Sequence, residues 1–141
     1  MVRVALGLVA GIVLALAVIM GIEGLSAQFF PIPANFASMD RVDQGVVMDE
    51  LPFLPKALVL LGWGVAAALG GVAARAIGGK DRLAWAIAAL VIAGALVTSF
   101  TIPHPLWMRL GAVFAPLAGG WLAARLPLPE LTLAGWRRTA S

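Results

Sequence analysis

The sequence predicts an all-α integral membrane protein in which four helices cross a lipid bilayer. Of the 141 residues, 62% are hydrophobic and only 12% are charged, whereas soluble domains are nearer half apolar and a quarter charged. The apolar residues gather into four runs, each close to the roughly 20 residues that a helix needs to cross a bilayer. None of these runs alternates in the way that barrel strands do. Lipid is therefore expected to cover apolar surface that a chain of this size has no interior to hide.

The expected spans run from about residue 4 to 30, 55 to 77, 83 to 102 and 106 to 126. The first span resembles a secretory signal peptide, with a possible cut after Ala27. Its apolar run exceeds the roughly 7–15 residues of a signal peptide, so we expect an uncleaved anchor while cleavage stays open. The five tryptophans lie near expected span ends, where an aromatic belt forms: Trp63, Trp85, Trp107, Trp121 and Trp136.

Two segments outside the spans have their own expected structure, within a single membrane domain of residues 1–141. Residues 34–54 form an outer loop in which Ser38 caps a short interfacial helix. The apolar face of that helix is expected to carry Met39, Val42, Val46 and Val47. Residues 127–141 form a cytoplasmic tail.

The distribution of Lys and Arg predicts that both termini face the cytoplasm, because basic residues gather on that side of a membrane. The expected inner side carries Arg3, Arg75, Lys80, Arg82, Arg125, Arg137 and Arg138, against Arg41, Lys56 and Arg109 outside. These basic residues lie at the ends of apolar runs, so membrane lipids rather than nucleic acid are the expected partners. The residues expected to bind lipid headgroups are Arg75, Arg125, Arg137 and Arg138.

The two halves of the chain predict an internal repeat. The first span ends at Pro31-Ile32-Pro33 and the third at Pro103-His104-Pro105, where proline cannot continue a helix. The second and fourth spans both close with Gly-Gly followed by Ala-Ala-Arg. The expected architecture is a four-helix bundle of two parallel-repeat helical hairpins. A chance match among common Gly, Ala and Pro residues stays open.

Small residues recur at every fourth position in the second and fourth spans. Such stripes let helix backbones approach closely, and they mark packing faces within the chain or between copies. The expected helix-packing residues are Gly62, Ala66, Gly70 and Ala74, then Gly111, Ala115, Gly119 and Ala123.

Glu23 is the expected intramembrane charge. It precedes Pro31 by about eight residues, or roughly 12 Å of helix. A carboxylate at that depth is costly unless it is paired, protonated or exposed to a wet cavity. Arg109 is its expected partner, and Ser26 lies one turn along the same helix face. A second interpretation stays open, in which hydrocarbon ends near Ile22 and Glu23 lies at the interface.

Enzyme activity is not expected. The chain has no cysteine and one histidine, and no nucleophile and base stand at a spacing that predicts catalysis. His104 lies between two prolines and is expected to be a turn residue or a weak pH sensor, because a metal site needs several ligands. No metal and no cofactor are predicted.

The chain resembles a group of small four-helix bacterial membrane proteins that have no assigned function. The matching residues are Glu23, Pro31-Ile32-Pro33, Leu51-Pro52, Gly70-Gly71 and Ile102-Pro103-His104-Pro105-Leu106-Trp107. The resemblance covers nearly the whole chain and implies a bacterial inner membrane. Members of the group often carry His four residues after the glutamate, where this chain has Ala27, so a Glu–His site is not implied.

The expected function is that of a non-enzymatic membrane protein. It would be a small structural or accessory subunit that self-associates, or binds a larger membrane complex, through its Gly/Ala faces. The alternative is a small oligomeric transporter or channel that uses Glu23. A Glu23 that faces a water-filled cavity favours transport, whereas one sealed by Arg109 favours the structural role. Lipid binding between the hairpins is a third possibility.

Overall fold

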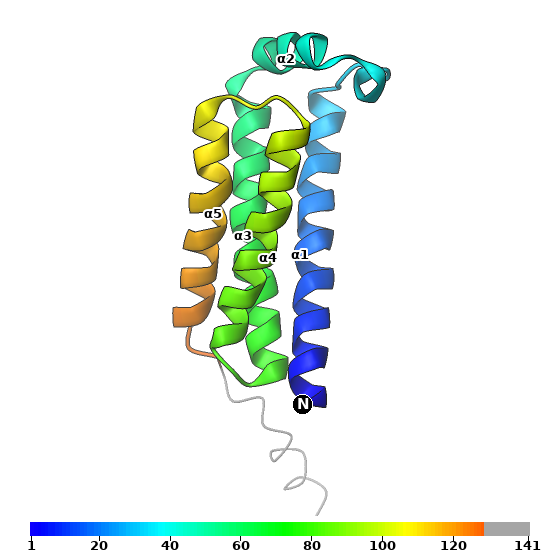
Figure 1. Cartoon of the computed structure of the whole chain (residues 1–141). Helices are drawn as coiled ribbons and strands as arrows, with labels where there is room; N and C mark the ends of the chain where they lie inside the picture. The colour runs from blue at the N-terminus through cyan, green and yellow to red at the C-terminus, as the bar shows by residue number, and fades with distance from the viewer. Residues whose placement is uncertain (129–141) are drawn as a thin grey trace, which may run out of the picture.

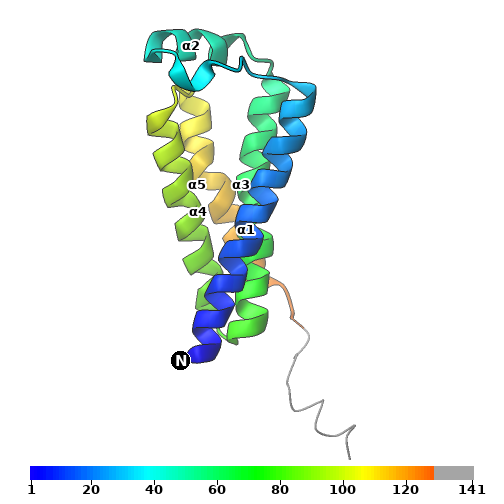
Figure 2. The ribbon, with the colours of Figure 1, turned by 90° about the vertical axis from the view of Figure 1, so that its right-hand side faces the viewer.

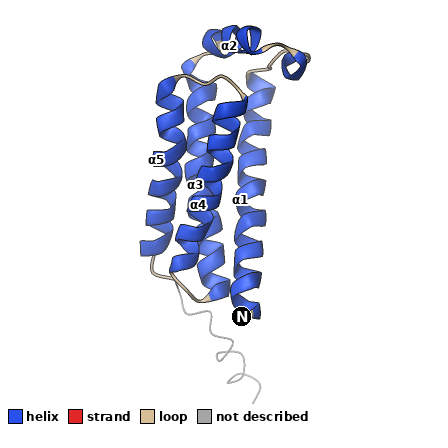
Figure 3. Cartoon of the chain, viewed as in Figure 1, coloured by secondary structure: helices blue, strands red, loops and turns tan. Residues whose placement is uncertain are grey.

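The computed structural model describes residues 1–128, and these residues form helices joined by short connections. Four long helices stand side by side as a bundle: α1 (Val2–Phe29), α3 (Phe53–Gly78), α4 (Arg82–Thr101) and α5 (Leu106–Arg125) (Figures 1 and 3). All four are long and apolar enough to cross a membrane. The prediction of an all-α chain with four apolar helices of membrane length is therefore confirmed.

The remaining helices lie at one end of the bundle, here called the α2 end. The single turn η1 (Phe36–Ser38) is followed by α2 (Arg41–Glu50), which runs across the tops of the long helices (Figure 1). The N-terminus lies at the opposite end. Prolines delimit the long helices at the α2 end, since Pro52 precedes α3 and Pro105 precedes α5. At the other end, Gly79 closes α3 in the left-handed conformation with φ 69°, which glycine adopts without steric cost.

The cap predicted for the short helix was wrong. The Asp40 carboxylate, not Ser38, caps α2 by accepting hydrogen bonds from the backbone N–H groups of Val42 and Asp43 at 2.8 and 2.9 Å. Ser38 instead ends η1 and donates its hydroxyl to a carbonyl within that turn. An extended Met39–Asp40 step precedes α2, in which Met48 is buried while Val42 and Val46 are exposed.

α3 is the central helix of the bundle. It packs against α1, α4 and α5, whereas α1 and α5 have no extensive contact and α1 touches α4 only lightly. Figure 2 shows the ribbons of α1 and α4 separating toward the α2 end. The bundle is therefore tight around α3 and looser between α1 and α4.

Candidate functional site

The small-residue stripe of α3 packs against α1. Gly62, Ala66, Gly70 and Ala74 are all buried. A Cβ on Gly70 would lie 2.6 Å from the Gly11 carbonyl oxygen, so the two backbones are in direct contact. The matching surface on α1 is a stripe of its own, Gly7, Gly11 and Ala15, which sequence analysis overlooked although its four-residue spacing was readable.

The stripe of α5 packs against a second side of α3. Gly111 meets Leu60, Gly119 lies against the Gly64 carbonyl, and Ala123 lies within 2.8 Å of the position that a Cβ on Gly71 would take. Gly119 and Ala123 are buried, while Gly111 and Ala115 are half-buried. The Gly/Ala faces of both spans are therefore used within one chain.

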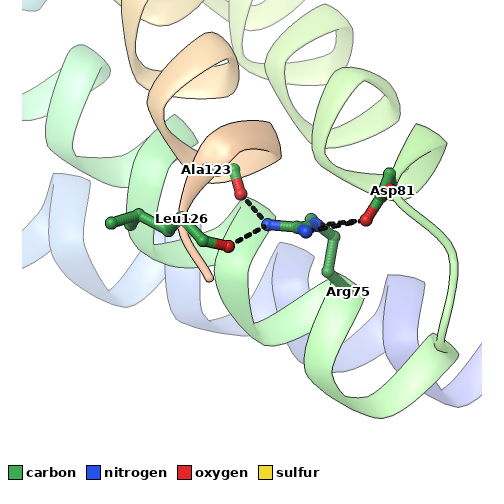
Figure 4. A network of polar contacts seen from close by, with 4 residues as sticks. All are labelled: Arg75, Asp81, Ala123 and Leu126. Atoms are coloured by element: carbon green, nitrogen blue, oxygen red, sulfur yellow. Dashed lines mark hydrogen bonds and ion pairs between the residues drawn. The ribbon is translucent and has the colours of Figure 1, made fainter. Parts of the chain in front are cut away.

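Arg75, expected to bind lipid headgroups, is instead held inside the protein (Figure 4). Its side chain is only 9% exposed and pairs with the Asp81 carboxylate at 2.7 Å. The same guanidinium donates to the carbonyls of Ala123 and of Leu126, the latter at 3.1 Å. Those carbonyls lie at the end of α5, where no further turn of helix supplies donors. Arg75 therefore joins α3, α5 and the start of α4.

The other predicted headgroup residues fall into two groups. Arg125 is exposed and its guanidinium lies 4.6 Å from the centre of the Trp121 ring, a cation–π contact that leaves it near the end of the bundle. Arg137 and Arg138 lie outside the described residues, as do Trp136 and most of the predicted tail.

Trp63 does not belong to an aromatic belt. It lies ten residues into α3, about 15 Å along the helix, and it is 3% exposed within the core. Trp85, Trp107 and Trp121 are partly exposed and close to helix ends. Trp63 therefore forms part of the protein interior at mid-depth.

A cavity of about 200 Å³ lies beneath α2, at the end where α1 and α4 separate. Most of its lining is apolar and includes Phe30, Phe36, Met48, Leu51 and Met108. Five polar side chains also line it, from α1, α3, α4 and the turn that follows α4: Glu23, Ser26, Lys56, Thr98 and His104. An apolar pocket with a few convergent polar groups is the usual form of a ligand site.

α2 is fastened over this cavity by hydrogen bonds at both of its ends. Arg41 donates to the Phe100 carbonyl in the last turn of α4 at 2.8 Å, and Lys56 of α3 donates to the Asp49 carbonyl at 3.4 Å. Between them, Gln44 donates to the Phe36 carbonyl at 3.1 Å, and Met48 is buried against the bundle. Hydrogen bonds to α3 and α4 therefore hold α2 over the cavity.

Glu23 lines the cavity without the partner expected for it. α1 ends at Phe29, so Glu23 lies six residues, or about 9 Å, from the helix end. The expected pair with Arg109 does not form: Arg109 is exposed on α5, which is not a neighbour of α1. Among the described residues the one ion pair is Arg75–Asp81. Ser26 is buried on the same helix face and lines the same cavity.

His104 lines the cavity, and one hydrogen bond orients its ring. Its Nδ1 lies 2.7 Å from the Ile102 carbonyl oxygen, and because a carbonyl only accepts, Nδ1 must carry the proton. In the neutral ring Nε2 therefore carries no proton and can only accept a hydrogen bond.

A second cavity of about 210 Å³ lies deeper in the bundle, between α1 and α4 with Trp63 as its floor. Its lining contains no polar side chain: Ile12, Ala15, Leu16, Ile19, Trp63, Ile87, Leu90, Val91, Gly94 and Ala95. A site of this composition is suited to an apolar group.

Residues 1–128 contain no group of three or more His, Asp or Glu side chains arranged to hold a metal ion. A search against protein-family models, curated proteins and solved structures finds no match to the chain.

Proposed function

We propose that this chain is a non-enzymatic membrane protein that binds a ligand in the cavity beneath α2. The observation that carries the proposal is Glu23, a carboxylate on the cavity wall with no cation at ion-pair distance among residues 1–128. An unpaired charge at this depth is costly, and such residues usually mark a binding or transport path. The polar side chains around it supply donors and acceptors but no base positioned on a nucleophile, which supports binding rather than catalysis.

An accessory role remains part of the proposal, with a changed means of association. The Gly/Ala faces are packed inside one chain, so they give no support to self-association. A partner helix would have to meet one of the remaining apolar faces. α1 offers the broadest of these, because it is the least buried of the four long helices.

Transport is the second candidate function, and the state of Glu23 favours it. A carboxylate sealed by Arg109 would have had a structural role, whereas one that faces a cavity is able to contact a solute. α3 occupies the centre of the bundle, so a single chain has no room for a pore of its own. Transport would therefore need α2 to move and open the cavity.

The orientation that we propose places the α2 end outside and both termini in the cytoplasm of a bacterial inner membrane. The end opposite α2 carries Arg3, Arg75, Lys80, Arg82 and Arg125, which agrees with the excess of basic residues on the inner side of membrane proteins. The bacterial membrane follows from the resemblance of the sequence.

We also infer that the chain arose from two hairpins, α1–α3 and α4–α5. Both pairs pack together, and α1 and α4 end at corresponding prolines. The contacts between the two hairpins are unequal. A regular two-fold axis that relates them would pair α1 with α5 as it pairs α3 with α4, but of these two pairs only α3 and α4 are in extensive contact. Glu23 lies at the position that Ala95 has in the second hairpin, so the candidate site belongs to one hairpin only.

Single-cysteine labelling tests the cavity, since the natural chain has no cysteine. Ser26→Cys places a thiol on the cavity wall, and Ser99→Cys is the matched control, because Ser99 is 1% exposed and lines neither cavity. A small charged methanethiosulfonate added outside intact cells should modify Ser26→Cys and spare Ser99→Cys. Equal resistance of both variants, with both folded by circular dichroism, would refute a water-accessible site. Modification only from the cytoplasmic side would reverse the orientation.

A further inference from the structure

We propose that the two cavities form one binding site for a phospholipid whose headgroup carries a primary amine. An acyl chain occupies the groove between α1 and α4, and the headgroup lies beneath α2. This inference rests on the proposed function, because it assigns the ligand of the same cavity.

The linings of the two cavities follow one another along three helices. On α1, Ile12, Leu16 and Ile19 of the deeper cavity are succeeded by Glu23 and Ser26 of the cavity beneath α2. On α4, Gly94 and Ala95 are followed one turn later by Thr98, and on α3, Trp63 is preceded one turn earlier by Val59. These spacings of three and four residues keep the linings on one face of each helix. The two cavities are therefore arranged end to end.

The shape of the combined site matches a hydrocarbon chain. From Ile12 to Ser26 the helix rises about 21 Å. The two cavity volumes divided by that length give a cross-section about as wide as one acyl chain. A partner helix, which is about 10–12 Å across with its side chains, would not fit.

The groove is open to the side of the bundle, where lipid would be. A Cβ added to Gly94 would have no neighbour within 4 Å, and Leu16 and Leu90 on the two walls are more than half exposed. An acyl chain can therefore enter between α1 and α4 without unfolding a helix. The polar end of the site is covered by α2.

The charges beneath α2 select the headgroup. Glu23 offers an unpaired carboxylate, while Lys56 offers an ammonium whose hydrogen bond to the Asp49 carbonyl is long, at 3.4 Å. A zwitterionic headgroup satisfies both, with its amine at Glu23 and its phosphate at Lys56. An anionic headgroup such as a phosphatidylglycerol would offer no cation to Glu23, a carboxylate on a mostly apolar cavity wall, and an unpaired charge within a membrane is unfavourable.

Quenching of Trp63 by brominated lipid tests this proposal. Trp63 lines the groove but is only 3% exposed, so bulk lipid scarcely reaches its ring. A variant that keeps Trp63 and replaces the other four tryptophans with Phe is placed in phosphatidylglycerol vesicles. A minor fraction of phosphatidylethanolamine with brominated chains is then added, or the same fraction of brominated phosphatidylglycerol. We expect an apparent affinity roughly tenfold higher for the amine lipid, the size expected from one hydrogen bond to a charged group.

Three variants in this background assign the effect to the site. Gly94→Leu fills the groove without striking the protein and should abolish quenching. Gly21→Leu is its matched control, because a Cβ there also has no neighbour within 4 Å and the residue lines neither cavity. Glu23→Gln keeps the shape and removes the charge, and it should reduce the affinity for the amine lipid to that for phosphatidylglycerol.

The outcomes separate this inference from the function on which it rests. Equal quenching by the two lipids that Gly94→Leu removes would overturn the headgroup assignment and leave a lipid chain in the cavity. If neither lipid quenches beyond its fraction in the vesicle, the lipid assignment is overturned. The proposed function survives that result if Ser26→Cys is still modified from outside, and it falls as well if Ser26→Cys is inert.

Discussion

Replacement of Arg75 tests whether contacts within the chain, rather than lipid headgroups, hold this residue. Arg75→Met keeps a long apolar stem and removes every donor of the guanidinium. The change breaks the contacts to the Ala123 and Leu126 carbonyls at the end of α5 and the ion pair with Asp81. We therefore expect a less stable bundle, with the loss concentrated where α3, α4 and α5 meet.

The structure sets the size of the loss. Each hydrogen bond from a charged donor to a carbonyl contributes about 1.5–3 kcal/mol when its partner is otherwise left unsatisfied. Asp81 is 79% exposed, so its ion pair contributes about 1 kcal/mol or less. The contact to the Ala123 carbonyl is part-buried while the one to Leu126 is exposed to water, so Arg75→Met should lower the free energy of unfolding by about 2–4 kcal/mol. Asp81→Asn, which removes only the exposed partner, should cost about 1 kcal/mol or less.

The assay is unfolding in dodecylmaltoside micelles by titration with sodium dodecyl sulfate, followed by circular dichroism. Equal losses in the two variants would show that the carbonyl contacts add nothing, and the reasoning would fail. A loss in Arg75→Met that appears only when anionic lipid is added would instead return Arg75 to the role of a headgroup ligand. Our expectation is the same loss with and without such lipid.

Two further substitutions test the close contact between α1 and α3 and the N-terminal cap of α2. Gly70→Ala should destabilise the bundle by about 1–3 kcal/mol in the same titration, because its Cβ would lie 2.6 Å from the Gly11 carbonyl oxygen. Gly21→Ala, where a Cβ has open space, should be neutral or stabilise the helix by up to about 1 kcal/mol; equal effects at the two positions would contradict the close approach. Asp40→Ala should weaken α2 by about 1 kcal/mol and speed amide hydrogen exchange at Val42 and Asp43, and unchanged exchange would show that the cap is dispensable.

The sequence predicted the limits of the long helices well and their neighbours poorly. Hydropathy and proline positions report where a helix enters and leaves an apolar layer, so the four spans were found to within a few residues of the observed helices. The same patterns do not say which helix lies beside which. The expected Glu23–Arg109 pair joined two residues near the same end of the bundle, yet they stand on α1 and α5, which are not neighbours.

Two other predictions differ from the observed contacts for related reasons. Arg75 was assigned to headgroups because basic residues at span ends usually reach them, but the end of α5 presents carbonyls that need donors. Trp63 was placed at a membrane interface because its apolar run begins close by, whereas α3 starts at Phe53 and buries Trp63 on its third turn. In both cases a neighbouring helix, invisible in the sequence pattern, decided the environment.

The cavity beneath α2 follows from the order of residue sizes along α1. At the end opposite α2, Gly7 and Gly11 bring the backbone of α1 against α3, where an added Cβ would lie 2.6 Å from the Ala74 and Gly70 carbonyl oxygens. Toward the α2 end the contact passes to a branched side chain, and a Cβ on Gly62 would meet Ile22 at an ordinary 3.4 Å. The α1 backbone therefore approaches α3 most closely at the end opposite α2. The space beside α4 at this end is covered by α2, and Glu23 lines the cavity that remains there.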